Sequence, residues 1–151
     1  MGPIYLLDTN IISELARPRP DAVVLGAIQS HLGLLALPAI AWHELCYGVA
    51  RLPDGKRKTL LHRFLLDVVA PSFEVVPYDD HAAWVHGTLQ AGLDARGRTL
   101  PFADSQIAAI AVAHNLILVT RNTADFADIP GLMMEDWFAP SGHACRVRDP
   151  E

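Results

Sequence analysis

Short runs of apolar residues alternate along this chain with longer stretches in which apolar residues recur every three or four positions. The short runs predict buried strands at 4–7, 34–38, 73–77, 116–120 and 131–135. The longer stretches predict helices at 8–16, 21–32, 39–51, 56–69, 79–97 and 101–115. Strands that alternate with helices are typical of a parallel sheet packed against helices. The pattern therefore predicts an α/β fold with a central parallel sheet of four to five strands flanked by helices.

Residues that break helices and form turns separate the predicted elements. The prolines in RPRP at 17–20 end the first helix, and Asp21 is placed to cap the second. Residues 140–151 show no hydrophobic periodicity, which is typical of irregular chain. We therefore expect one domain at 1–139, followed by an irregular C-terminal tail at 140–151.

The composition fits one compact domain. The chain has 151 residues, of which 51% are hydrophobic and 19% are charged, so it is long enough to bury a single core. Its formal net charge is −5, and a general basic surface for nucleic acid is therefore missing. Any polyanion would need a local basic patch or bound cations.

The cysteines and the apolar runs indicate where the protein works. Cys46 and Cys145 have neither the spacing of metal ligands nor that of a disulfide framework, which fits a reducing compartment. The run LGLLALPAIAW at 32–42 is too short to cross a bilayer, and the start of the chain lacks the features of a signal peptide. We therefore expect a soluble, cytoplasmic protein without membrane association.

Four acidic residues lie where a parallel sheet gathers its functional groups. Asp8 directly follows the first predicted strand, and Asp125 lies five residues after Thr120, where the fourth strand ends. Asp104 is in the first turn of the helix before that strand, and Glu44 is on the helix after the second strand. Ligands of open parallel sheets bind beyond the carboxyl ends of the strands. We therefore expect these four side chains to meet in one cleft.

Each acid taken alone also has an ordinary structural explanation. Asp8 is placed to cap the helix that follows it, and Asp125 to cap a turn. Asp104 could interact with its helix dipole, and Glu44 could be a surface acid. The functional interpretation therefore depends on the four acids occurring together.

Acids that gather in one cleft repel one another, and burial makes each charge more costly. Such a cluster needs a cation. Oxygen ligands without accompanying His and Cys favour Mg²⁺ over Zn²⁺, and Mn²⁺ is able to substitute. A cation held in this way can bind a phosphodiester oxygen and lower the pKa of a coordinated water. The four acids therefore predict metal-dependent hydrolysis of a phosphodiester bond.

The order of these motifs is similar to that in a known family. From about Tyr5 to about Trp137 the chain resembles the PIN-domain ribonucleases, specifically the VapC-like toxins of bacterial toxin–antitoxin pairs. The resemblance rests on LLDTNIISEL, IAWHELCYGVARL, LPFADSQIAAIAVAHNLILVTRNTADF and LMMEDW. It implies a PIN-like fold and a Mg²⁺-dependent endoribonuclease that hydrolyses RNA.

The resemblance also assigns roles to single residues. It implies that four acids bind the metal and carry the catalysis: Asp8, Glu44, Asp104 and Asp125. Three polar side chains would orient them, a role that their oxygens suit: Asn10, Thr120 and Asn122. Three residues near the expected cleft could contact RNA: Arg121, Arg17 and Ser13. Arg121 could instead pair with one of the site acids.

The family's partner is a small VapB-like antitoxin that occludes the acidic cleft, and homodimers are usual in the family. We therefore expect both a cognate antitoxin and a homodimer.

One departure from the family is visible. The family often carries a Thr three positions before the glutamate, but this chain has Ala41 there, which leaves Glu44 without its usual hydrogen-bond donor.

Three other classes of protein share single features with this chain. Phosphatases of the haloacid dehalogenase type need a second Asp where this chain has Asn10, which cannot protonate a leaving group. Receiver domains need a lysine after a later strand, and no lysine lies beyond residue 58. HELCY resembles the zinc-protease motif HExxH, but Tyr47 replaces the second histidine. Two alternatives stay open: a non-toxin PIN nuclease of RNA processing, and a catalytically silent protein-binding module.

Overall fold

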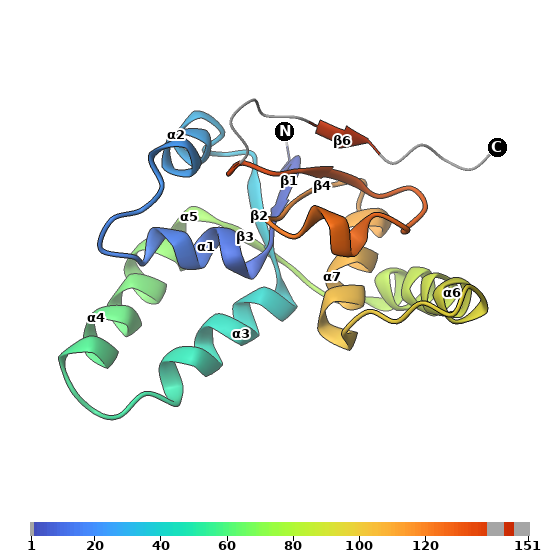
Figure 1. Cartoon of the computed structure of the whole chain (residues 1–151). Helices are drawn as coiled ribbons and strands as arrows, with labels where there is room; N and C mark the ends of the chain where they lie inside the picture. The colour runs from blue at the N-terminus through green and yellow to red at the C-terminus, as the bar shows by residue number, and fades with distance from the viewer. Residues whose placement is uncertain (1, 139–143, 147–151) are drawn as a thin grey trace.

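A single sheet forms the centre of the computed structural model, which describes residues 2–138 and 144–146 (Figure 1). Its strand order is β3-β2-β1-β4-β5-β6. The strands are β1 (Tyr5–Leu7), β2 (Leu35–Pro38), β3 (Glu74–Val76), β4 (Ile117–Val119), β5 (Met133–Glu135) and β6 (Ala144–Arg146). Strands β1 to β5 are parallel, and β6 pairs antiparallel with β5. The predicted α/β fold with a central parallel sheet is therefore confirmed.

Helices connect the strands and cover both faces of the sheet. They are α1 (Thr9–Leu15), α2 (Ala22–Ser30), α3 (Ala39–Ala50), α4 (Lys56–Phe64), α5 (Ala70–Ser72), α6 (Asp80–Ala95) and α7 (Phe102–Ala113). A π-helical turn, η1 (Leu65–Val69), joins α4 to α5, and a 3₁₀ turn, η2 (Thr123–Phe126), follows β4. The helix predicted over 56–69 is therefore an α-helix whose last turn is widened. Among the described residues, none of the helices combines the length and the hydropathy that crossing a bilayer requires.

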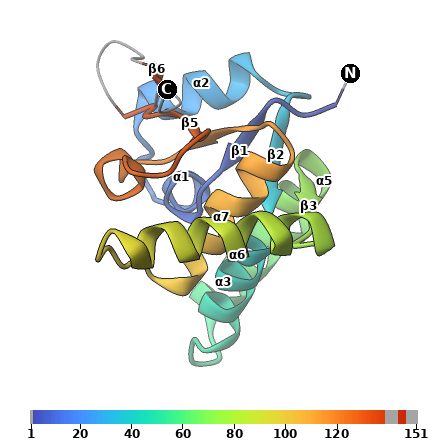
Figure 2. The ribbon, with the colours of Figure 1, turned by 90° about the vertical axis from the view of Figure 1, so that its right-hand side faces the viewer.

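The core consists of two layers, one on each face of the sheet. Leu6 and Leu7 are neighbours in β1 and point to opposite faces, as successive strand residues do. Leu6 packs in the layer that contains Ile107 of α7, and Leu7 packs in the layer that contains Ile11 of α1. Figures 1 and 2 show the same division, with α6 and α7 on one side of the sheet and α1 and α2 on the other.

The strand order places a ligand crevice between β1 and β4. The chain runs from β1 through β2 to β3 in one direction, and β4 and β5 lie on the other side of β1. The order therefore reverses between β1 and β4, and such a reversal opens a crevice at the carboxyl ends of the strands. The Asp8 N–H donates a 2.9 Å hydrogen bond to the Val119 carbonyl oxygen, which holds the two strand ends together.

The prediction of an irregular tail is wrong for residues 144–146, which form β6 against β5. The pairing partner lies about ten residues earlier in the sequence, and three residues are too few for a visible periodicity. The strand is therefore created by the free edge of β5 and not by a local pattern. Residues 139–143 and 147–151 lie outside the described part, so the domain boundary at 139 stays a prediction.

Candidate active site

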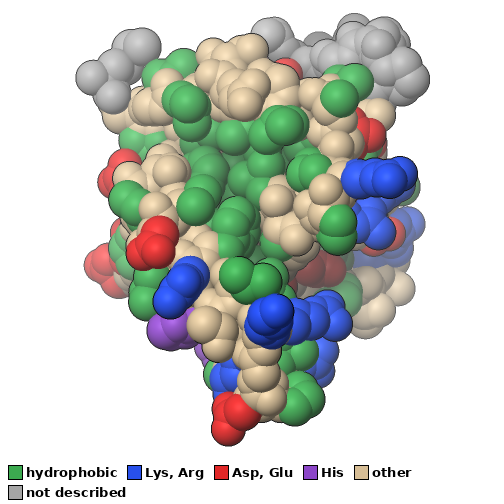
Figure 3. Space-filling model, turned by 90° about the vertical axis from the view of Figure 1, so that its left-hand side faces the viewer, with side chains coloured by type: hydrophobic (Ala, Val, Ile, Leu, Met, Phe, Trp, Pro, Cys, Tyr) green, Lys and Arg blue, Asp and Glu red, His purple; other side chains and the backbone are tan. Residues whose placement is uncertain are grey.

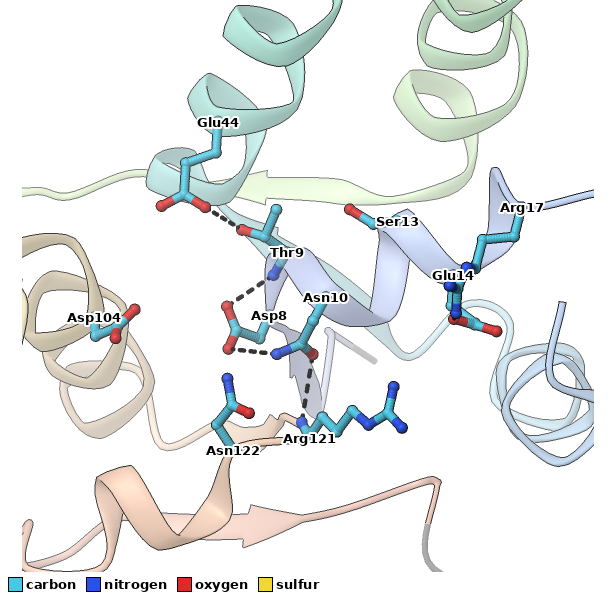
Figure 4. Close-up of a pocket in the computed structure, with 10 residues that line it drawn as sticks. All are labelled: Asp8, Thr9, Asn10, Ser13, Glu14, Arg17, Glu44, Asp104, Arg121 and Asn122. Carbon is cyan, nitrogen blue, oxygen red and sulfur yellow. Dashed lines mark hydrogen bonds and ion pairs between the residues drawn. The ribbon is translucent and has the colours of Figure 1, made fainter.

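A cleft of about 590 Å³ lies at the carboxyl ends of β1 and β4. Ten residues line it: Asp8, Thr9, Asn10, Ser13, Glu14, Arg17, Glu44, Asp104, Arg121 and Asn122. Figure 4 shows that they come from the end of β1, from α1, α3 and α7, and from the segment after β4. The fold therefore brings together segments that are far apart in the sequence, and three of the four predicted acids are among them.

Asp8 is buried at the base of the cleft, with 6% of its surface exposed. It is the N-cap of α1, and its Oδ1 accepts a 2.8 Å hydrogen bond from the Thr9 N–H. Its Oδ2 accepts hydrogen bonds from Thr120 Oγ1 at 2.9 Å and from Asn10 Nδ2 at 3.4 Å. The capping role and the cleft position are therefore compatible, because both use the same fixed carboxylate.

The segment after β4 is tied to this carboxylate by two further hydrogen bonds. The buried Thr120 hydroxyl accepts a 3.1 Å hydrogen bond from the Asn122 N–H. The Arg121 N–H donates a 3.3 Å hydrogen bond to Asn10 Oδ1. Asn10 and Thr120 thus contact Asp8 directly, whereas Asn122 reaches it through Thr120 and uses its backbone. The Asn122 side chain lines the cleft (Figure 4).

Glu44 is held by a residue that the sequence reasoning missed. Its Oε2 accepts a 2.7 Å hydrogen bond from the Thr9 hydroxyl. Ala41, where the family often has a threonine, is fully buried. The hydroxyl that supports Glu44 therefore comes from α1 instead of from α3. Thr9 and Glu44 are 35 positions apart, so only the place of Thr9 beside Asp8 could have drawn attention to it.

The carboxylates influence one another electrostatically. Burial raises the pKa of Asp8, and the Glu44 charge raises it further, against the lowering effect of its hydrogen bonds. Burial also raises the pKa of Asp104, in the first turn of α7. Three other acids raise that pKa further: Asp8, Glu44 and Asp125. The cleft therefore concentrates negative charge that its hydrogen bonds offset only in part.

Asp125 is placed differently from the other predicted acids. It lies in η2, its side chain is exposed, and it is not among the residues that line the cleft. In the same turn Phe126 is buried, so the orientation of the turn is set by the core. The charge of Asp125 still reaches Asp104, as the raised pKa of Asp104 shows. The structure therefore brings three acids together and leaves the fourth near the rim.

The donor set fits a hard, hydrated divalent cation. The acids that line the cleft offer oxygen ligands only. Burial raises the pKa of Asp8 and of Asp104, and the charges of neighbouring acids raise both further, so a bound cation would relieve an unfavourable accumulation of negative charge. In the described part of the chain, no three His, Cys, Asp or Glu side chains are close enough together to enclose a metal by themselves. Mg²⁺ usually takes one or two carboxylates directly and keeps several waters, so an open arrangement suits it.

Basic residues line the other side of the cleft. The Arg121 guanidinium lies 4.5 Å from the centre of the Phe138 ring, a cation–π arrangement, and Figure 4 shows it pointing away from the acids. The alternative that Arg121 pairs with a site acid is therefore wrong. Arg17 Nη1 lies 3.2 Å from Oε2 of the buried Glu14. Ser13 is exposed on α1 and also lines the cleft.

Known proteins resemble this chain along most of its length. It is 40% identical over 126 residues to the VapC ribonuclease Y4jK of Sinorhizobium fredii, which covers 82% of this chain and 90% of that protein. It is 36% identical over 137 residues to the toxin FitB of Neisseria gonorrhoeae, which covers 89% of this chain and 99% of that protein.

The fold is similar to solved structures as well. A structure of FitAB bound to an IR36 DNA fragment superposes with a TM-score of 0.82 and 32% identity, over 95% of this chain and 99% of that chain. Residues 5–132 match the profile of the PIN domain family. These residues include β1 to β4 and the three predicted acids that line the cleft, Asp8, Glu44 and Asp104. The chain therefore belongs to the PIN domain family.

Proposed function

We propose that this protein is a Mg²⁺-dependent endoribonuclease and the toxin of a toxin–antitoxin pair. The observation that carries this proposal is the cleft in which Asp8, Glu44 and Asp104 meet at the carboxyl ends of β1 and β4. The relatives named as a VapC ribonuclease and as a toxin support the reaction class and the biological role.

The acids of the cleft would hold the divalent cation. Asp8 lies at the end of β1, Asp104 and Glu44 reach in from α7 and α3, and Asp125 in η2 would hold coordinated waters from the rim. A bound divalent cation lowers the pKa of a coordinated water and binds a phosphodiester oxygen. The surrounding residues keep the carboxylates in place: Thr120 and Asn10 bind Asp8, and Thr9 binds Glu44.

The basic side of the cleft would bind the phosphates on either side of the scissile bond. Arg17 and Arg121 line the side of the cleft opposite Asp8, Glu44 and Asp104, and Ser13 of α1 lies between the two groups. The chain as a whole is acidic, with a net charge of −5, so a local basic patch is needed to attract a polyanion. Phosphate contacts of this kind position RNA without reading its sequence.

The test compares wild-type protein with Asp8→Asn and Asp104→Asn in an RNA cleavage assay. We expect cleavage with Mg²⁺ or Mn²⁺, none in EDTA, and a loss of at least about 100-fold in both variants. Asp94→Asn, an exposed acid on α6, is the matched control and should retain full activity. Full activity in either cleft variant would exclude the assigned site. Cleavage that persists in EDTA would exclude metal chemistry, and no cleavage under any condition would favour a protein-binding role.

A VapB-like antitoxin has a suitable surface beside the cleft. A groove of about 850 Å³ between α1, α3 and α4 shares Thr9, Ser13, Arg17 and Glu44 with the cleft. Its walls are mainly apolar, with Leu60 63% exposed, and Lys56 and Arg57 stand at its edge. Figure 3 shows apolar side chains gathered on the face that carries α1, α2 and α4, bordered by basic ones.

An amphipathic antitoxin segment with acidic flanks would fit this groove, because its apolar face would cover Leu60 and its acids would meet the basic edge. Its end would then reach the cleft and exclude RNA. The homodimer and the cytoplasmic location stay predictions from the sequence.

A further inference from the structure

We propose that a series of hydrogen bonds from the half-buried Tyr78 through the buried His86 to the buried Ser105 positions the neighbouring Asp104 for cation binding. These hydrogen bonds join the segment before α6, α6 itself and the first turn of α7. The inference rests on the proposed function, in which Asp104 is a metal ligand. The three residues are positioning residues, because they act through the backbone of α7 and lie outside the cleft lining.

The hydrogen bonds form an unbroken series. The Tyr78 hydroxyl lies 2.7 Å from His86 Nδ1, and His86 Nε2 lies 2.9 Å from Ser105 Oγ. The Ser105 hydroxyl donates a 2.9 Å hydrogen bond to the Phe102 carbonyl oxygen, at the start of α7. His86 and Ser105 are each only 3% exposed. Buried polar groups of this kind contribute most when every one of them is satisfied.

The donors and acceptors fit one protonation state of the histidine. Because the Ser105 proton is given to Phe102, Ser105 accepts from His86 Nε2–H, and Nδ1 accepts from the Tyr78 hydroxyl. Burial lowers the pKa of His86, which favours this neutral form. The hydrogen bonds therefore all point the same way, from Tyr78 to His86, to Ser105 and to the Phe102 carbonyl, and each of these polar groups has a partner.

The first turn of α7 depends on His86 because it has no side-chain cap and little apolar burial of its own. Its N-cap is Pro101, which makes no side-chain capping hydrogen bond. Its first residue, Phe102, is 59% exposed, and Ser105 is the first buried residue of the helix. The fully buried apolar residues begin only at Ile107. His86 of α6 thus fastens this turn in two ways, through its 2.9 Å contact with Ser105 Oγ and through its ring, whose centre lies 5.0 Å from the centre of the Phe102 ring.

Asp104 is the residue that needs such an anchor. It lies directly before Ser105, and it faces Asp8 and Glu44 across the cleft (Figure 4). Carboxylates that face one another without a cation between them repel, and this repulsion acts on the first turn of α7. The hydrogen bonds of Ser105 oppose it and hold the Asp104 carboxylate near the proposed cation position.

The test uses Ser105→Ala and His86→Leu, with His86→Gln as the variant that keeps a donor and an acceptor. Three properties are measured in the full chain: Mn²⁺ affinity, kcat and KM for RNA cleavage, and amide hydrogen exchange in residues 102–106. For Ser105→Ala and His86→Leu we expect about tenfold weaker Mn²⁺ binding and about tenfold lower kcat, with KM nearly unchanged. Exchange in the first turn of α7 should be faster by a similar factor, and His86→Gln should retain most of each property.

Leu89→Ala is the control, because Leu89 of α6 is buried in the same core layer as Ile107 of α7 but makes none of these hydrogen bonds. It should lower Tm while Mn²⁺ affinity stays within about twofold of wild type. If Leu89→Ala weakens Mn²⁺ binding as much as Ser105→Ala does, the chain only stabilises the fold and the positioning role is refuted. If Ser105→Ala matches wild type in affinity and exchange, this inference alone fails. If the wild-type protein neither binds Mn²⁺ nor cleaves RNA, the proposed function fails and the positioning role falls with it.

Discussion

The Thr9 hydroxyl donates a 2.7 Å hydrogen bond to Glu44 Oε2, and this bond joins α1 to α3 at the cleft. Thr9 also gives its N–H to Asp8, so one residue holds two of the acids. Burial raises the pKa of Asp8, and the negative charge of Glu44 raises it further, so the two carboxylates repel each other. Thr9 therefore fixes the spacing of a pair of carboxylates that would otherwise separate.

Thr9→Val should reduce RNA cleavage by about tenfold, because the Glu44 carboxylate loses its donor while the Asp8 contact to the backbone remains. Cleavage kinetics at saturating Mg²⁺ give the measurement. Thr88→Val, which removes an exposed hydroxyl on α6, is the control and should retain full activity. Ala41→Thr added to Thr9→Val restores a hydroxyl one turn before Glu44, and partial recovery is expected. Unchanged activity in Thr9→Val would show that Glu44 needs no such support.

Asp104→Asn should raise Tm at neutral pH by a few degrees. The native pKa of Asp104 is raised above its ordinary value of 3.8, so the folded state binds its proton more tightly than the unfolded state does. Stability therefore falls as pH rises from below 3.8 through the native pKa, and the ionised group is destabilising above that window. The asparagine avoids this cost at pH 7, and its advantage should vanish where both states are protonated.

Thermal denaturation between pH 3 and pH 8 measures this difference in Tm. Asp94→Asn is the control, since Asp94 is exposed on α6, and it should not change the pH profile. A Tm gain for Asp104→Asn that is the same at every pH would mean that the acid is not the source of the effect.

Mg²⁺ and Mn²⁺ should stabilise the wild-type protein, because a cation that binds only the folded state offsets the repulsion among Asp8, Glu44 and Asp104. At a concentration 100 times Kd the expected gain is about 2.7 kcal/mol. A thermal shift titration measures it, and EDTA should reverse it. Asp104→Asn should lose most of the shift. An equal shift in wild type and variant would place the cation elsewhere on the protein.

Arg121→Ala and Arg17→Ala should each raise KM for RNA several-fold and change kcat less, because these side chains line the side of the cleft opposite the acids. The slope of the logarithm of the RNA binding constant against the logarithm of salt concentration should become shallower in each variant, by the amount expected for the loss of about one phosphate contact. RNA binding in the presence of Ca²⁺, measured over a range of KCl concentrations, gives the slope. Arg63→Ala, an exposed residue of α4, is the matched control. A control slope that falls as much would indicate a general charge effect only.

Leu60→Glu should weaken antitoxin binding by at least tenfold and leave RNA cleavage intact, because Leu60 lines the apolar groove and not the cleft. Calorimetry with the purified antitoxin measures the affinity. Leu32→Glu changes a similarly exposed leucine away from the groove and should bind normally. If both variants bind the antitoxin as wild type does, the groove is not the docking surface.

The succession of strands and helices along the chain could be predicted from the sequence. The meeting of Asp8, Glu44 and Asp104 beyond the carboxyl ends of the strands could be predicted as well. These features depend on local patterns, since hydrophobic periodicity defines each element and a residue that ends a parallel strand lies at a known edge of the sheet. The family motifs are local in the same sense, which explains why the PIN-like fold could be predicted and then confirmed.

Only the tertiary structure decided which side chains support these acids. Thr9 reaches Glu44 across 35 positions, and His86 reaches Ser105 across 19, so no local pattern reveals either pair. The exposed place of Asp125 follows from the burial of Phe126, and β6 forms because β5 has a free edge. The sequence determined which acids the sheet presents, because that depends on local order. The packing of helices from distant parts of the chain determined how those acids are held.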